Sequence, residues 1–384
     1  MQNFLKQRLE QRQQAHLYRQ RLIHEGAQTP VLQMAGRTYL AFCSNDYLGL
    51  ASHPILINTL QHAATTYAVG AGASHLVNGH ARAHHALEEE LASFTGRERA
   101  LLFSTGYMAN IGAVTALVER QDAVFSDKLN HASLVDAVQL SRAHSHRYTH
   151  NDMEMLARLL TQSTANHKLI VTDGVFSMDG DIANLPDIVT LAKQQQAWVM
   201  VDDAHGLGVL GATGRGIIEH YHLSATDVPI LMGTLGKAFG VTGAFVAGST
   251  LLIENLIQYA RSYIYTTALP AAIAETLRAS LRLVQTETWR REKLQILIKH
   301  FRQGATQLAL PLLVSDTPIQ GILLGSAEKA LMLSQALLQQ GIIVTAIRPP
   351  TVPQNTARLR ITFSALHEIE HVDRLLGALE HYSL

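Results

Sequence analysis

Short runs of apolar residues alternate with longer segments whose apolar positions repeat at helical spacing between about residues 40 and 275. Turn residues separate these segments. Several of the short runs are apolar at nearly every position, which is typical of strands covered on both faces. The pattern predicts strands at 100–103, 122–126, 169–173, 198–202, 230–234 and 244–247.

The clearest helix between these strands is expected at 83–94. Leu87, Leu91 and Phe94 follow one another at i, i+4 and i+7, and Gly96 supplies a stop signal. Helices that connect consecutive strands in this way imply an α/β fold with a mostly parallel sheet flanked by helices.

The two ends of the chain have a different pattern. Residues 3–24 carry Phe4, Leu5, Leu9, Leu17 and Ile23 at roughly helical intervals, which predicts an amphipathic arm that packs on the main body. Beyond residue 275, helical stretches at 271–283 and 291–307 precede strand-like pieces at 321–324 and 358–363, as in a smaller α+β domain. We therefore expect an arm at 1–39 that belongs to the small domain, a large domain at 40–275, and a small domain at 276–384.

Composition narrows the class of protein. The 384 residues include 31 Lys or Arg and 31 Asp or Glu, so the formal net charge is zero. The chain therefore lacks the excess of basic residues that is typical of proteins that bind nucleic acid. Cys43 is the single cysteine, so no intramolecular disulfide can form, and a reducing cytoplasm is expected. No run of about 18 apolar residues indicates a membrane span.

Histidine is abundant, at 20 residues, and the pairs His84/His85 and His144/His146 invite a metal interpretation. Neither pair has a third acidic or histidine ligand at a recognisable spacing. The sequence therefore predicts no metal site.

Polar residues follow three of the predicted strands. Asp173 ends one strand, Asp202 ends the next and precedes Asp203-Ala-His205, and the third continues as Thr234-Leu-Gly-Lys237-Ala-Phe-Gly. The carboxyl edge of an open parallel sheet is where ligands bind. A lysine crowded by glycines can lose its proton and act as a nucleophile, and a buried carboxylate needs a cation. Pyridoxal 5'-phosphate requires this pair, which makes Lys237 and Asp202 candidates for its site.

An anion site is expected after the strand at 100–103. Ser104-Thr105-Gly106-Tyr107 leads there into a helical run, so backbone N–H groups at the helix start would face a phosphate. Alone, this segment would indicate an ordinary strand-to-helix turn.

Four motifs together resemble the α-oxoamine synthases, a branch of the fold-type I pyridoxal-phosphate enzymes. They are Ser-Asn-Asp-Tyr-Leu-Gly at 44–49, Gly-Val-Phe-Ser-Met-Asp-Gly at 174–180, Asp-Ala-His at 203–205 and Gly-Lys-Ala-Phe-Gly at 236–240. The resemblance runs from about residue 20 to the C-terminus. It implies pyridoxal 5'-phosphate as cofactor, a large domain with a mostly parallel sheet, and a smaller α+β domain.

The resemblance also implies roles for individual residues. Four would be catalytic, with Lys237 as the Schiff-base lysine, Asp202 as the partner of the ring nitrogen, His131 stacked on the ring and His205 on its hydroxyl side. The remaining residues expected at the cofactor are Ser177, Gly106, Tyr107, Thr234, Thr266 and Thr267. The last two would reach the phosphate of a neighbouring subunit, which implies a homodimer with shared sites.

By the same resemblance, Arg360 binds the amino-acid carboxylate with help from Asn45, and Arg21 and Thr351 meet the acyl substrate. A planar guanidinium can grip a carboxylate with two parallel hydrogen bonds. For Arg348, a substrate role and a structural salt bridge are equally open.

The glycine-rich stretch departs from the family. It contains Gly70-Ala-Gly72-Ala73-Ser74, where the family often has Gly-Ser-Gly-Gly-Ser, so the methyl group of Ala73 restricts the backbone there.

Ala-Ile-Arg-Pro-Pro-Thr-Val-Pro at 346–353 most resembles the branch of biotin biosynthesis, which condenses L-alanine with a pimeloyl thioester on CoA or acyl carrier protein and releases CO2. A glycine-using branch, of the 2-amino-3-oxobutyrate CoA ligase or 5-aminolevulinate synthase type, is the alternative. A non-catalytic pyridoxal-phosphate-binding scaffold is a third reading from a different class.

Overall fold

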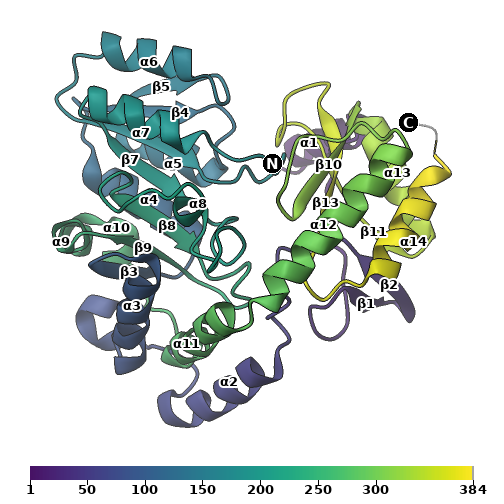
Figure 1. The fold of residues 1–384 in the computed structure, drawn as a ribbon, viewed down its shortest axis with the longest axis horizontal. Coiled ribbons are helices and arrows are strands. Elements are labelled where there is room, and N and C mark those ends of the chain that lie inside the picture. Colours follow the sequence, from purple (N-terminus) through teal and green to yellow (C-terminus); the bar gives the residue numbers. More distant parts are fainter. Residues whose placement is uncertain (383–384) are drawn as a thin grey trace. The chain divides into compact units, whose positions relative to one another are not determined.

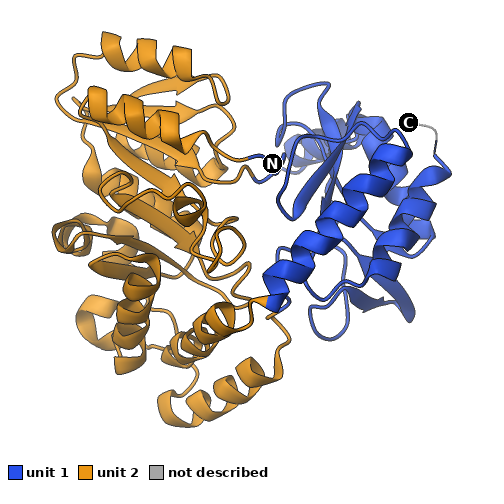
Figure 2. Ribbon diagram, viewed as in Figure 1, with its two compact units in different colours: residues 1–49, 177–181, 289–384 blue, residues 50–176, 182–288 orange. Residues whose placement is uncertain are grey.

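The computed structural model describes residues 1–382, and its internal contacts divide the chain into two compact units (Figure 2). The large unit comprises residues 50–176 and 182–288, and the small unit comprises residues 1–49, 177–181 and 289–384. Residues 276–288, expected in the small domain, lie in the large unit because α11 (Ala271–Thr286) packs against α2 (Pro54–Tyr67) and α3 (Arg82–Thr95).

A seven-stranded sheet forms the centre of the large unit (Figure 1). Its strand order is β3-β9-β8-β7-β6-β4-β5, and β9 alone runs antiparallel to its neighbours. The strands are β3 (Arg99–Phe103), β4 (Ala123–Asp127), β5 (His144–Tyr148), β6 (Lys168–Asp173), β7 (Trp198–Asp202), β8 (Ile230–Thr234) and β9 (Ala244–Gly248). The prediction of a mostly parallel α/β sheet is confirmed.

Helices and short helical turns precede, connect and follow these strands. Besides α2, α3 and α11, they are a π-helical turn η1 (His75–Gly79), α4 (Gly106–Leu117), α5 (Ala132–Ser141), α6 (Met153–Gln162), α7 (Leu185–Gln194), α8 (Ile217–His220), α9 (Thr250–Tyr259) and α10 (Arg261–Ile264). The predicted helix at 83–94 is α3, and Gly96 caps its C-terminus with a φ of 64°. Glycine reaches this left-handed conformation without steric cost.

The core of the large unit lies between the sheet and its helices. Inward residues of β3, β6 and β8 pack with the apolar faces of α4, α5 and α9, and buried Ala109 and Ala113 let α4 approach the sheet closely. Every residue of β4 and β9 is buried. This is expected for strands of a sheet that is covered by helices on both faces.

The small unit contains two three-stranded sheets. One has the order β1-β2-β11, with β11 parallel to β2, and the other, antiparallel, has the order β10-β13-β12. Its elements are α1 (Gln2–Gln14), β1 (Val31–Met34), β2 (Arg37–Ala41), α12 (Trp289–Gln307), β10 (Ile319–Gly325), α13 (Ala327–Gln339), β11 (Ile342–Ile343), β12 (Thr345–Ile347), β13 (Ala357–Thr362) and α14 (Ile369–Glu380).

The N-terminal arm differs from its prediction. α1 ends at Gln14, so Leu17 and Ile23 lie beyond it, and none of its residues is buried. Its apolar residues are too few among Gln and Arg to form a continuous stripe, and Phe4 remains 60% exposed. The predicted packing of an arm over 3–24 is therefore wrong for this chain. None of the described helices combines the length and the apolar character that crossing a membrane requires.

Candidate active site

The three strands that were expected to end in polar residues are neighbours in the sheet. β6, β7 and β8 lie side by side and parallel, and Asp173 is the register partner of Asp202. Because parallel strands end at the same edge, both carboxylates and the segment after Thr234 meet at the carboxyl edge of the large unit.

Asp202 is buried at the end of β7. Its Oδ2 accepts a hydrogen bond of 2.7 Å from Nδ2 of Asn110, and its Oδ1 accepts one of 3.0 Å from the backbone N–H of Ala204. Both donors are neutral, so these bonds orient the carboxylate without balancing its charge. A buried carboxylate in such surroundings favours a cationic partner.

Asn110 is a residue that the sequence analysis missed. It is fully buried on α4, and its Nδ2 also donates to Oγ of Ser133 at 2.8 Å. The available signal was a single amide in an otherwise mostly apolar helix, because a buried amide must find polar partners. Asn110 and Ser133 together connect α4, α5 and β7.

His131 is the N-cap of α5, with Nδ1 2.7 Å from Oγ of Ser133, while its backbone N–H donates to Oδ2 of Asp173 at 3.0 Å. Desolvation lowers the pKa of the His131 imidazole, and the charge of Lys237 lowers it further, against the opposing effect of Asp202. Burial first, and then the charge of Asp202, raise the pKa of Asp173 well above its usual range. These shifts favour a neutral imidazole.

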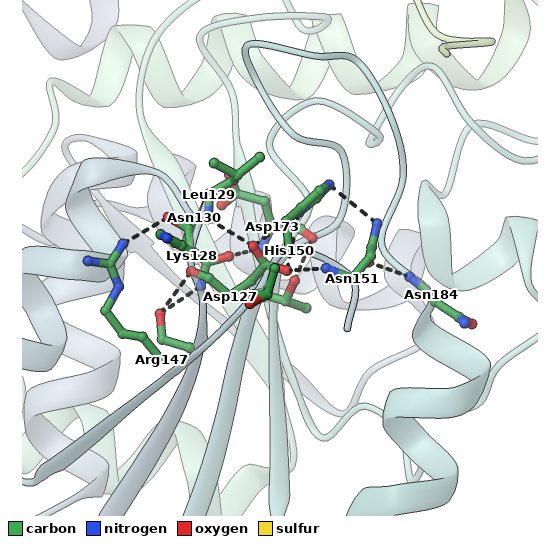
Figure 3. A network of polar contacts seen from close by, with 12 residues as sticks. Asp127, Lys128, Leu129, Asn130, Arg147, His150, Asn151, Asp173 and Asn184 are labelled. Carbon is green, nitrogen blue, oxygen red and sulfur yellow. Dashed lines mark hydrogen bonds and ion pairs between the residues drawn. The ribbon is translucent and has the colours of Figure 1, made fainter. Parts of the chain in front are cut away.

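A network of polar contacts holds the loop that carries His131 (Figure 3). The carboxylate of Asp127 accepts hydrogen bonds from the backbone N–H groups of Leu129 and Asn151 and lies 3.1 Å from Nδ1 of His150. Asn130 donates to the carbonyl of Val171 on β6 and accepts from the backbone N–H of Asp173. The position of His131 is therefore fixed from both β4 and β6.

Lys237 lies in a tight loop between β8 and β9. Its Nζ is 2.9 Å from Nε2 of buried His205. The N–H of Gly240 donates to the carbonyl of Lys237, and Gly240 has a φ of 68°. A Cβ at Gly240 would lie 2.5 Å from the backbone nitrogen of Ala51, so this position requires glycine. Gly236 has no such close neighbour and is not required by packing.

The start of α4 has the form expected of an anion site. Thr105 is the N-cap, and its Oγ1 accepts a hydrogen bond of 3.2 Å from the N–H of Met108. A Cβ built on Gly106 would lie 4.0 Å from Oγ1 of Thr234, so the helix start is close to the end of β8. Tyr107 donates its hydroxyl hydrogen to Asp136, a contact that orients its ring.

Thr266 and Thr267 follow α10 in the large unit. Thr267 forms an isolated bridge with Ser74, and its carbonyl accepts a hydrogen bond from Ser104. These contacts connect the segment to the glycine-rich stretch and to the turn before α4.

Arg360 and Asn45 come together in the small unit. Arg360, on β13, donates from Nε to the carbonyl of Ser177 at 2.6 Å and from Nη2 to Oδ1 of Asn45 at 3.2 Å. Tyr47 is another partner, and burial raises the pKa of its hydroxyl to about 12 despite the nearby guanidinium. Within the described chain all of these partners are neutral, so the charge of Arg360 is available to an anion. Ser177, expected at the cofactor, belongs to this unit.

The other expected substrate residues, and the neighbouring Arg358, have different partners. Arg358, two residues from Arg360, forms an ion pair with Asp179. Arg19 rather than Arg21 donates to Oγ1 of Thr351, at 3.3 Å, and Arg21 is exposed. Arg348 donates to the carbonyl of His16.

Comparisons with known proteins agree with this geometry. The family model described as aminotransferase class I and II matches residues 37–379. The chain is 60% identical over 377 residues to 8-amino-7-oxononanoate synthase of Thioalkalivibrio sulfidiphilus, covering 98% of this chain and 96% of that protein. It is 59% identical to the enzyme of the same name from Nitrosococcus oceani, covering 97% and 98%.

Two solved structures show the same fold. Serine palmitoyltransferase from S. paucimobilis, with a bound PLP–myriocin aldimine, gives a TM-score of 0.93 at 30% identity and covers 98% of this chain and 96% of that one. The 8-amino-7-oxononanoate synthase from Francisella tularensis gives a TM-score of 0.78 at 32% identity, covering 89% and 97%.

Proposed function

The chain belongs to the aminotransferase class I and II family and, within it, to the 8-amino-7-oxononanoate synthases, and from this premise we propose that it condenses L-alanine with a pimeloyl thioester. The products are 8-amino-7-oxononanoate, CO2 and the free thiol of CoA or acyl carrier protein, in the biotin pathway. The observation that carries the proposal is the 60% identity to a synthase of this name over 98% of the chain.

The residues at the carboxyl edge fit pyridoxal 5'-phosphate. Asp202 is a buried carboxylate whose hydrogen-bond donors are both neutral, which suits a protonated ring nitrogen. His131 offers an imidazole that can stack on a ring, and the first turn of α4 offers N–H groups to a phosphate. When bound, the cofactor supplies an electrophilic aldehyde and a protonated ring that withdraws electrons from the amino-acid Cα.

The side chains of the chain then have separate tasks. With the cofactor bound, Nζ of Lys237 would be the group that holds its aldehyde carbon between turnovers and that accepts the Cα proton of L-alanine. Nε2 of His205, 2.9 Å from Nζ, orients that amine. Asp202 would hold a proton on the ring nitrogen, and Asn110 fixes the direction of its carboxylate. Ser177, Gly106, Tyr107 and Thr234 are the further cofactor residues that we propose.

Arg360 is proposed to bind the carboxylate of L-alanine, with Asn45 at its side. The neutral character of its present partners supports this role, because a buried guanidinium is satisfied best by a planar anion. For the acyl substrate we propose Thr351 and Arg21, with Arg19 holding Thr351 in place.

The test is a titration of the purified holoenzyme. Its visible absorption band is followed with L-alanine, glycine and L-serine in parallel, and thiol release is measured with pimeloyl-CoA and with pimeloyl-acyl carrier protein. We expect the largest spectral response and turnover with L-alanine. A preference for glycine would overturn the substrate assignment, and cofactor binding without thiol release would indicate a scaffold.

We further propose a cytoplasmic homodimer in which Thr266 and Thr267 bind the phosphate of the neighbouring subunit. Two inactive variants test it together. A Lys237→Ala chain mixed with a chain in which both threonines are valine should regain activity on subunit exchange, because one site of the mixed dimer is intact. Sedimentation at the mass of one 42.1 kDa chain would contradict the dimer.

A further inference from the structure

Four histidines and one glutamate gather in the large unit around the start of α3. We name His75, His80, His84, His85 and Glu88 the histidine cluster. Within the described residues, the ligand atoms of His80, His85 and Glu88 all lie within 4.8 Å of one another, and so do those of His75, His80 and His84. In the fold, the pair His84/His85 therefore has acidic and histidine neighbours, which its spacing in the sequence did not reveal.

His84 has no nitrogen to offer to an ion. Its Nδ1 accepts a hydrogen bond of 3.0 Å from the N–H of Ala81, and its Nε2 lies 2.5 Å from the carbonyl of Leu269. These bonds cap α3 and attach it to the segment before α11. Ligation by His84 would break one of them in a buried place, so the set with His85 and Glu88 is favoured.

His85 and Glu88 are three residues apart on α3 and therefore share a face of the helix. His80 lies just before the helix, and its Nε2 is 4.0 Å from Oε2 of Glu88. Ligands of a tetrahedral ion at metal distances of about 2.0–2.2 Å stand roughly 3.3–3.6 Å apart. An ion would therefore require these two side chains to close by less than about 1 Å.

In His80 and Glu88, the second polar atom of the side chain, which the ion would not use, already has a hydrogen-bond partner. Nδ1 of His80 is 2.9 Å from Nδ1 of His75, and Oε1 of Glu88 accepts the N–H of Leu102 at 3.0 Å. Ligating histidines and carboxylates in metal sites are commonly fixed in this way by second partners.

We propose that His80, His85 and Glu88 bind a divalent transition-metal ion such as Zn²⁺, with water in the remaining positions. Two histidines and one carboxylate form a set that Zn²⁺ accepts. His85 is exposed and His80 is partly exposed, so an ion can enter from solvent. The competing contact of His85 with Glu89, at 3.4 Å, is a surface ion pair of little energy and is readily given up.

The experiment uses the holoenzyme after treatment with a chelator. Zn²⁺ is titrated in competition with a chromophoric chelator against the wild type, His85→Gln and Glu88→Gln, and His144→Gln is the matched control because His144 is an exposed histidine on β5. We expect each ligand variant to weaken Zn²⁺ binding at least about tenfold. The control should bind Zn²⁺ as the wild type does.

Both ligand variants should remain folded. His85 is exposed, and glutamine at position 88 retains an oxygen to accept the N–H of Leu102. Unchanged cofactor content and unchanged circular dichroism would verify this. Equal Zn²⁺ affinity of the wild type and His85→Gln, or no binding to the wild type at micromolar Zn²⁺, would overturn the proposal whatever the outcome for alanine turnover.

Discussion

Replacement of Arg360 by lysine keeps the positive charge but removes the planar fork. In the structure, the guanidinium donates to the carbonyl of Ser177 and to Oδ1 of Asn45, and still has N–H groups for a carboxylate. The lysine ammonium has three donors at one point. It cannot retain both protein contacts and also grip a carboxylate through two parallel hydrogen bonds.

The magnitude follows from one lost hydrogen bond to a charged group. Such a bond contributes about 1.5–3 kcal/mol, and each 1.4 kcal/mol corresponds to about a tenfold change. The KM for L-alanine should therefore rise about 10- to 150-fold, whereas the KM for the pimeloyl thioester should change little.

Initial-rate kinetics with each substrate varied in turn would measure this separation. Arg358→Lys is the matched control, because Arg358 lies on the same strand and pairs with Asp179. We expect that control to lower thermal stability without raising the KM for L-alanine. A KM for L-alanine within twofold of the wild type in Arg360→Lys would refute the assignment of the carboxylate site.

Further changes address the other parts of the chain. Lys237→Ala should abolish thiol release while circular dichroism stays unchanged, and retained turnover would exclude its catalytic role. Asp202→Asn should lower kcat at least about 100-fold, since an amide stabilises a ring proton less by several kcal/mol, and steady-state rates with cofactor in excess would show it. Gly240→Ala should destabilise the large unit by about 1–3 kcal/mol in urea unfolding, because its φ is 68° and its Cβ would meet the backbone of Ala51. Burial lowers the pKa of His367 from 6.5 to about 4, so the unfolded chain binds the proton first and stability falls as pH drops below 6.5. His367→Gln should remove about 2 kcal/mol of the stability difference between pH 8 and pH 5, and an unchanged difference would contradict this.

The large unit was largely predictable from the sequence, because its central strands are buried on both faces. β7 and β8 have the bounds expected from their apolar runs, and the predicted family is confirmed. β5 was missed because its His-Ser-His-Arg-Tyr sequence is polar and mostly exposed, as an edge strand permits. Periodicity carries no information about such a strand.

The candidate site was predictable to a smaller extent. Residues at strand ends, such as Asp202, are marked by the position of the strand itself. Asn110 was not, because the sequence does not tell which face of α4 turns toward Asp202. Glu88 and His80 were missed as partners for the same reason, since their meeting depends on how the chain enters α3.

The small unit is assembled from chain segments that the ribosome releases at very different times. β2 pairs with β11 through Leu40 and Ile342, which lie about 300 residues apart. At about 5–20 residues per second, the first hairpin is exposed for roughly 15–60 s before its partner strand is made. The strands of the large unit are all complete by residue 248. A premature stop codon before residue 342 would therefore leave the N-terminal strands with an unpaired edge, and chaperone dependence or aggregation during synthesis should originate at residues 31–41.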